Sequence, residues 1–333
     1  MIDIIMPVYN TPISDLRRCL DSIERQSFKD YKVYIIDDGS LDEVKLFLDL
    51  YVNDKEKFIV KHVVNGGVSR ARNIGIESSN SEYLTFVDSD DTIEDNFLEE
   101  AINLIRDNDL DLVIGGYNEI KNEVIYKIRK CDDGFYIYDN SNLDLVMDKL
   151  LSGKLKEDNK SIGSLPTGRI YTRIYKRSVL GDLRFNSNLG MSEDTLFMID
   201  FMNKVEHIGL SSSVWYNYYI NDYSISRRKV NEKVINDHMK FIEEVSKRMR
   251  LEKEERIKNA YIFRILKSLI NLSDLIKSGG LDKSTLESIL NNPVFLCLKD
   301  LDVSGYINIS DEELKVLNNY KDGMYDEIWF YCF

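Results

Sequence analysis

Residues 2–40 of this chain read IDIIMPVYNTPISDLRRCLDSIERQSFKDYKVYIIDDGS. Ile2–Val8 and Val33–Ile36 are short, largely apolar runs, and Ile13–Ile23 between them carries its apolar residues at helical spacing. Because helices cover both faces of a parallel sheet, its strands are continuously apolar rather than alternating. The stretch therefore predicts two buried strands joined by a helix, the repeating unit of an α/β fold.

The same alternation continues along the chain and predicts a mostly parallel sheet flanked by helices. Further strands are expected at 58–64, 83–87, 112–115 and 215–220, and further helices at 44–52, 69–76, 97–105 and 195–201. A hairpin is expected to join 124–128 to 135–138 around the turn at 132–134. The polar segment 152–168 is expected to be a mobile loop and a candidate acceptor-side lid.

From about residue 230 the pattern becomes almost entirely helical. Two amphipathic stripes predict helices over 230–245 and 257–276, the second ended by Gly279-Gly280. We therefore place a domain boundary between residues 229 and 230. The expected organisation is an α/β domain at 1–229, divided near residue 120, followed by a small helical domain at 230–333.

Composition excludes several classes of protein. The 333 residues include 44 basic and 57 acidic side chains, a net charge of −13, which repels nucleic-acid phosphates and anionic lipids. The four cysteines form no CxxC pair, which indicates reduced thiols rather than zinc ligands. With no secretory signal and no long apolar span visible, a cytoplasmic location is expected, with at most peripheral contact at the inner membrane face.

Polar clusters follow four of the predicted strands. They are Tyr9-Asn10, Asp37-Asp38-Gly39-Ser40, Asn65-Gly66-Gly67 and Asp88-Ser89-Asp90-Asp91. In open α/β sheets, ligands bind outside the carboxyl ends of the strands. We therefore expect these four clusters to meet at one edge of the sheet.

The Asp88–Asp91 cluster has two interpretations. Two carboxylates one residue apart at a strand end suit Mg²⁺ or Mn²⁺, with coordination positions left open for a diphosphate. Alternatively, Asp88 and Ser89 cap a helix that begins near Ile93. The pattern alone leaves both open.

The other clusters also carry two interpretations each. Asp37-Asp38-Gly39-Ser40 is a turn or a grip on ligand N–H groups. Gly67 to Asn73 contains two arginines, and it is a capped helix start or a phosphate site. Glu193-Asp194 supplies favourable acids at a helix N-terminus or a general base opposite the metal.

Six motifs in this order resemble the family 2 glycosyltransferases, an inverting group with the GT-A fold, over about residues 1–228. The motifs are Ile5-Met6-Pro7-Val8-Tyr9-Asn10, Asp37-Asp38-Gly39-Ser40, Gly67-Val68-Ser69-Arg70-Ala71-Arg72-Asn73, Phe86-Val87-Asp88-Ser89-Asp90-Asp91, Ser192-Glu193-Asp194 and Ser224-Ile225-Ser226. The resemblance implies transfer of a hexose or N-acetylhexosamine from a UDP-sugar to a hydroxyl of a bacterial surface glycan, wall polymer or glycoprotein.

The resemblance also implies roles for individual residues. Asp194 would be the general base with Glu193 supporting it, and Asp90 and Asp88 would hold the metal. Asp38 would accept from the uracil N–H, and either Arg70 or Arg72 would contact the nucleotide. The implied nucleotide-sugar site comprises Pro7, Val8, Tyr9, Asn10, Asp38, Gly39, Ser40, Asn65, Gly67, Arg70, Arg72, Asp88, Ser89 and Arg227.

One position departs from the family pattern. Many relatives carry a His or Arg shortly before the Ser-Ile-Ser motif, where this chain has Ile220. We expect Arg227 or Arg228 to hold the diphosphate instead. Aromatic side chains are candidates for stacking on acceptor sugars, namely Tyr171, Tyr175, Trp215, Tyr216, Tyr218 and Tyr219.

Two other functions stay open at this stage. A non-catalytic scaffold acting through the helical tail is disfavoured by the retained Asp88, Asp90, Asp91 and Asp194. A nucleotidyltransferase would open with a glycine-rich basic loop after the first strand, which residues 6–12 lack. The helical tail is also a candidate surface for homodimer formation.

Overall fold

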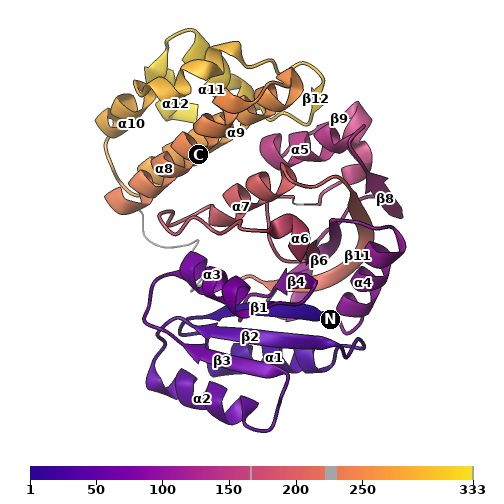
Figure 1. The fold of residues 1–333 in the computed structure, drawn as a ribbon. Helices are drawn as coiled ribbons and strands as arrows, with labels where there is room; N and C mark the ends of the chain where they lie inside the picture. The colour runs from indigo at the N-terminus through magenta and orange to yellow at the C-terminus, as the bar shows by residue number, and fades with distance from the viewer. Residues whose placement is uncertain (166, 222–230, 332–333) are drawn as a thin grey trace.

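The computed structural model describes residues 1–165, 167–221 and 231–331. A ten-stranded sheet runs through this described part, in the order β3-β2-β1-β4-β10-β6-β11-β5, with β7 paired to β6 and β8 to β11 (Figure 1). Helices lie on both sides of it, which confirms the α/β fold with a mostly parallel first half. The C-terminal helices gather at the opposite end of the molecule from β2 and β3 (Figure 1).

The first half of the sheet follows the predicted alternation closely. Strands β1 (Ile2–Val8), β2 (Tyr31–Asp37), β3 (Phe58–His62) and β4 (Tyr83–Phe86) are mutually parallel. The helices of this half are α1 (Ile13–Glu24), α2 (Asp42–Val52), α3 (Val68–Ser78) and α4 (Phe97–Asp107). Side chains of α1, α2 and α4 share one buried cluster on one face, whereas α3 packs against the other face.

The second half mixes directions. Strand β10 (Arg173–Lys176) is antiparallel to both β4 and β6 (Leu112–Lys121), while β11 (Ile208–Tyr219) is parallel to β6. The short strand β5 (Thr92–Ile93) closes the edge against β11. Helices α5 (Leu143–Ser152), α6 (Arg177–Leu180) and α7 (Glu193–Met202) complete this half.

The predicted hairpin around residues 132–134 is wrong. Strand β7 (Val124–Arg129) pairs antiparallel with β6, and β8 (Phe135–Tyr138) pairs with β11 instead. The tight turn lies at Asn122 and Glu123, which both adopt a positive φ, of 51° and 60°. Two consecutive left-handed residues match the twist of a two-residue hairpin.

The segment 152–168 is not the irregular loop that its polarity predicted. It forms β9 (Leu155–Lys156) and a 3₁₀ helix at Glu157–Ile162, and β9 pairs with β12 (Tyr306–Ile307) of the C-terminal region. The side chains of Asn159 and Ile162 are fully buried. The segment therefore connects the α/β region to the helical region, and its expected role as a lid stays an untested prediction.

The C-terminal region is helical, as predicted. It contains α8 (Glu232–Leu251), α9 (Glu255–Ser278), α10 (Lys283–Leu290), a 3₁₀ helix at Pro293–Asp300, α11 (Asp311–Lys321) and α12 (Tyr325–Tyr331). One buried cluster runs from Phe86 in the sheet through Phe197 on α7 to Leu266 on α9. In the described ranges no helix has the length and apolarity needed to span a bilayer.

Candidate active site

The loops at the carboxyl ends of β1, β2 and β4 meet, as the sequence predicted. The Asn10 N–H donates to Ser40 Oγ (2.9 Å), and the Leu41 N–H donates to Asn10 Oδ1 (2.8 Å), which links the first two loops. Asn10 holds a positive φ of 51°, a conformation that asparagine tolerates better than most residues. The side chains of Asn10 and Tyr9 stay exposed at this edge.

Asp38 organises the loop before α3. Its two carboxylate oxygens accept from the N–H groups of Gly66 and Gly67, both at 2.8 Å, and Asn65 donates to its carbonyl oxygen at 2.8 Å. Gly39 has a φ of +77°, and a Cβ there would lie 2.8 Å from the Asn65 nitrogen. The turn and ligand interpretations of this cluster are therefore compatible, because each carboxylate oxygen keeps a second lone pair.

A neighbouring pair supports this loop and was missed from sequence. Asp37 is fully buried, accepts from the Ser40 N–H (2.9 Å) and contacts His62 Nδ1 (2.6 Å). Burial lowers the pKa of His62, but its hydrogen bonds to Asp37 and Asp49 outweigh this and raise it above the usual value. A motif search does not find His62, because it comes at the end of an ordinary strand.

Arg72 joins the two acidic motifs. Its Nη1 donates to Glu193 Oε1 (3.0 Å) and Asp194 Oδ1 (2.8 Å), and its Nη2 donates to Asp88 Oδ1 (3.0 Å). Its side chain is only 4% exposed. Burial lowers the pKa of Arg72, yet the attraction of Asp194, Asp88 and Glu193 outweighs this and raises it. The fold thus brings Arg72 into contact with two acids that lie 121 and 122 positions later in the chain.

The aspartates of the Asp88–Asp91 cluster differ in their burial and their partners. Asp91 is buried, and its oxygens accept from the Tyr216 hydroxyl (2.8 Å) and the Tyr219 N–H (2.8 Å). Asp88 remains 28% exposed, and Asp90 Oδ2 accepts a weak hydrogen bond from the Asn221 side chain at 3.4 Å. The helix-cap interpretation is wrong, because α4 begins at Phe97 and the intervening residues form β5.

The chemistry of Asp88 and Asp90 fits a hard divalent cation. Burial, followed by repulsion from Asp88, raises the pKa of Asp90. Asp88 pairs with Arg72 through Oδ1, and together with Asp90 it offers the carboxylate oxygens that Mg²⁺ and Mn²⁺ prefer as ligands. Among the described residues no group of three or more His, Cys, Asp or Glu side chains could enclose a metal ion.

Asp194 is a buried carboxyl with a raised pKa. Burial raises the pKa of its carboxyl to about 7, with further contributions from Glu193 and Asp88, although Arg72 and Arg169 oppose the shift. It lies in the first turn of α7, after Ser192, which holds a φ of 58°. A carboxylate with a pKa near the operating pH can accept a proton effectively.

The remaining predicted residues occupy varied places at this edge. Arg70 donates to the Val64 carbonyl (2.6 Å) and is exposed, so Arg72 rather than Arg70 joins the acidic cluster. The side chains of Pro7 and Val8 are buried in the sheet. Ser89 Oγ lies 2.6 Å from Thr11 Oγ1. Arg227, Arg228 and the motif Ser224-Ile225-Ser226 lie outside the described residues.

Most of the aromatic stacking candidates are wrong. Tyr171, Tyr175, Trp215 and Tyr216 are at most 2% exposed and belong to the core, so only Tyr218 and Tyr219 retain partial exposure.

Arg18 and Arg169 are basic residues of this region that sequence reasoning missed. Arg18 donates to the Asp90 carbonyl (3.0 Å) and stacks over the Tyr219 ring at 3.8 Å. Neither arginine belongs to a recognisable motif, and only the fold brings them to the site.

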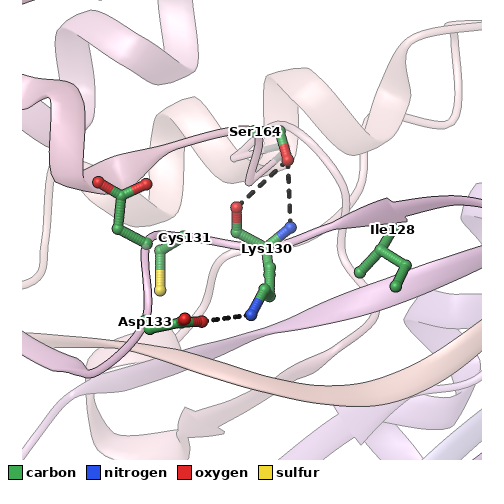
Figure 2. Close-up of a pocket in the computed structure, with 6 residues that line it drawn as sticks. Ile128, Lys130, Cys131, Asp133 and Ser164 are labelled. Atoms are coloured by element: carbon green, nitrogen blue, oxygen red, sulfur yellow. Dashed lines mark hydrogen bonds and ion pairs between the residues drawn. The ribbon is translucent and has the colours of Figure 1, made fainter.

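A surface depression of about 520 Å³ lies elsewhere, between β7 and β8 (Figure 2). Ser164 Oγ hydrogen-bonds the backbone of Lys130, and the Lys130 ammonium pairs with Asp133. Burial raises the pKa of the adjacent Cys131 thiol to about 11, so the thiol stays protonated at neutral pH. Because these polar groups form hydrogen bonds and an ion pair with one another, we assign the candidate active site to the loops at the strand ends and not to this depression.

Comparison with known proteins agrees with this fold. GlyG, a glycosyltransferase of Streptococcus pneumoniae, is 32% identical over 139 residues, which are 41% of this chain and 43% of GlyG. TarP of Staphylococcus aureus, a poly(ribitol-phosphate) beta-N-acetylglucosaminyltransferase, is 27% identical over 286 residues, 80% of this chain and 79% of TarP. The chain therefore spans less than half of GlyG but most of TarP.

A solved structure covers nearly the whole chain. The crystal structure of residues 1–349 of S. aureus TarS with UDP matches with a TM-score of 0.68 and 19% identity, over 99% of this chain and 89% of that one. At this identity the likeness shows the fold, which is GT-A with a C-terminal helical region.

The model of the glycosyl transferase family 2 matches residues 3–183, more than half of the chain. The chain belongs to this family.

Proposed function

We propose that this enzyme transfers a sugar from a UDP-sugar to a hydroxyl group of a bacterial glycan, wall polymer or glycoprotein, with inversion at the anomeric carbon. The observation that carries the proposal is the position of Arg72. Its guanidinium donates to Asp88 of the acidic pair and also to Asp194 and Glu193, so it holds these carboxylates close together. A leaving diphosphate and a general base need this proximity, because the hydroxyl that the base deprotonates attacks the carbon atom that the diphosphate leaves. The UDP in the TarS structure supports uridine as the nucleotide.

Asp90 and Asp88 would hold Mn²⁺ or Mg²⁺, which would stabilise the charge on the leaving diphosphate. Asp194 accepts the proton of the attacking hydroxyl, and Arg72 and Glu193 hold its carboxylate in place. General-base assistance of this kind contributes roughly 10²–10⁴-fold. The Asp38 loop, Tyr9 and Asn10 bind the nucleotide, in keeping with their position at the carboxyl ends of β1 and β2.

Calorimetric titration tests the donor side of this proposal. UDP, GDP and CDP are titrated with and without Mn²⁺ into the wild type and Asp90→Asn. We expect UDP to bind best, to need Mn²⁺ and to lose about tenfold or more in affinity in the variant. Asp95→Asn is the matched control, since Asp95 is exposed and forms a surface ion pair with Arg25.

Two results would contradict the proposal. Folded wild-type protein that binds no nucleotide would favour the scaffold function instead. A preference for GDP or CDP would contradict the assignment of a UDP-sugar as the donor. Undiminished Mn²⁺-dependent binding by Asp90→Asn would contradict the assignment of Asp90 as a metal ligand. With UDP-sugars that turn over, NMR of the product anomeric proton checks inversion.

A further inference from the structure

Arg18 connects helix α1 with the loop after β4 and with the end of β11. Its Nη2 donates to the carbonyl oxygen of Asp90 (3.0 Å), and its guanidinium carbon lies over the Tyr219 ring, 3.8 Å from the ring centroid. Its Nη1 pairs with Asp15 Oδ1 at 3.1 Å, three residues earlier on α1. An arginine can make these contacts together, because its planar guanidinium donates from its edge and stacks with its face.

The end of β11 that Arg18 contacts is joined in turn to the acidic cluster. The Tyr219 N–H donates to Asp91 Oδ1 (2.8 Å), and the side chain of Asn221, two residues further on, donates weakly to Asp90 Oδ2 (3.4 Å). The backbone of Asp90 is thus held from α1, while its carboxylate is contacted from the segment that follows β11. Arg18 links these two supports, because it contacts both the Asp90 carbonyl and Tyr219.

This arrangement fixes Asp90 without occupying its carboxylate. Arg18 donates to the backbone carbonyl, so the carboxylate oxygens stay available as ligands of a cation. Asp88 and Asp15 repel this carboxylate, and the guanidinium places a positive charge beside the three acids. Side chains that orient a metal ligand commonly contribute about ten- to hundredfold to metal affinity. A ligand that is already fixed needs no ordering when the cation binds.

We propose that Arg18 is a positioning residue, which holds the Asp90 loop against the end of β11 so that the carboxylate is in place before the cation and the diphosphate of the donor bind. This proposal rests on the proposed function, since it uses Asp90 as a ligand of Mn²⁺ or Mg²⁺. Arg18 acts through Asp90 and Tyr219 and carries no chemical step of the transfer. Changing Arg18 is therefore expected to weaken metal-dependent binding and to preserve binding of the nucleotide alone.

Two binding measurements test this role without an acceptor. Mn²⁺ binding is followed by the EPR signal of the free ion, and UDP is titrated calorimetrically with and without Mn²⁺. In Arg18→Gln we expect the affinity for UDP with Mn²⁺ to fall about tenfold or more, because the contacts with Asp90 and Tyr219 are lost. The affinity for UDP without metal should stay unchanged. Arg18→Lys keeps the positive charge but not the planar guanidinium, so it should recover only part of the loss.

The chain offers matched controls for these variants. Arg17→Gln should leave every affinity unchanged, because Arg17 is the exposed neighbour on α1 and lies over the Phe47 ring at 4.8 Å. Tyr219→Leu should weaken Mn²⁺-dependent binding, whereas Tyr219→Phe, which keeps the ring, should retain most of it. Arg18→Gln combined with Tyr219→Leu should lose less binding free energy than the two single variants together, since both changes remove the same contact. Melting temperatures establish that the variants are folded.

Three results overturn the proposal. The first is wild-type affinity for Mn²⁺ and UDP in folded Arg18→Gln. The second is an equal loss of UDP affinity with and without Mn²⁺, since the guanidinium would then bind the nucleotide itself. The third is wild-type affinity in Arg18→Lys, which would mean that the charge alone is needed.

Failure of the proposed function gives a different pattern. Wild-type protein that binds Mn²⁺ but no UDP would contradict the proposed function, and the EPR comparison of the wild type with Arg18→Gln would still decide the role of Arg18. Wild-type protein that binds no Mn²⁺ would contradict both, because Asp90 would then hold no cation.

Discussion

At the scale of single residues, Asp194 combines burial, two neighbouring acids and two neighbouring cations. Its pKa of about 7 predicts that kcat/KM falls as the pH drops through this region, because protonation removes the base. An ordinary aspartate, with a pKa of about 3.9, would give no such fall above pH 5. Arg72 lowers the pKa of Asp194, so Arg72→Gln should move the fall to higher pH. Rates measured between pH 5 and 9 test both statements.

Asp194→Asn is the companion variant. It should lower kcat by roughly 10²–10⁴-fold while UDP affinity stays within a few-fold, since the base acts only in the chemical step. Asp200→Asn, on the same helix but paired with Arg248 on α8, provides the control and should keep its activity. A variant of Asp194 that retains more than a tenth of the wild-type kcat would assign the base elsewhere.

The sequence predicted those candidate site residues that stand in short local motifs. Asp88 and Asp90 follow a predicted strand, so the rule that ligands bind at strand ends predicts their place at the sheet edge. Asp194 lies in the first turn of a helix, and its place opposite them was implied only by the resemblance to the family. Arg169 and His62 could not be predicted, because neither has a motif and each acquires its partners only through non-local packing. The fold turns Arg72 inward and leaves Arg70 exposed, while which of the two contacts the nucleotide stays a prediction.

At the scale of elements, local periodicity was sufficient to predict the helices and strands that pack against elements close to them in sequence. Apart from the unpredicted short strand β5, the elements from β1 to α4 lie close to their predicted positions, because from β1 to α3 each strand is followed by a helix that packs on it. The hairpin prediction failed because β8 pairs with β11, about 70 residues later. The actual turn at Asn122 and Glu123 carries no glycine, and glutamate is a rare residue at a positive φ.

The contact between β6 and β11 gives a test at this scale. A Cβ on Gly115 would lie 2.1 Å from the ring of Trp215, which is fully buried against Phe97. Gly115→Ala should therefore lower the free energy of unfolding by about 1–3 kcal/mol through overpacking. Denaturant unfolding measures this loss.

A double-mutant cycle with Trp215→Phe separates this contact from other effects. The smaller ring relieves the clash, so the double variant should be less destabilised than the sum of the single variants. Strict additivity would mean that Gly115 is required for another reason.

At the scale of the whole molecule, the question is whether the helical tail is an independent domain. The boundary at residues 229 and 230 is a proposal, and one buried cluster crosses it, from Phe86 to Leu266. The tail is also joined by polar contacts, since Asp148 on α5 contacts Arg256 (3.1 Å), Lys156 (3.1 Å) and the Tyr306 hydroxyl (2.9 Å). These contacts join α5, α9, β9 and β12, so we expect the chain to unfold as one cooperative unit.

Asp148→Asn tests this expectation. The carboxylate is fully buried, and the change removes it from Lys156 and from Arg256, although Arg256 keeps its ion pairs with Asp158 and Asp144. We expect a cost of up to about 3–5 kcal/mol, the range for breaking a buried ion pair. Scanning calorimetry should show a single transition, lowered by several degrees, for the sheet and the tail together. Asp326→Asn breaks an exposed ion pair with Lys283 and should change the stability by less than about 1 kcal/mol. Two separate transitions, with UDP raising only one of them, would instead make the tail a domain of its own, because a ligand stabilises only the unit whose folded state it binds.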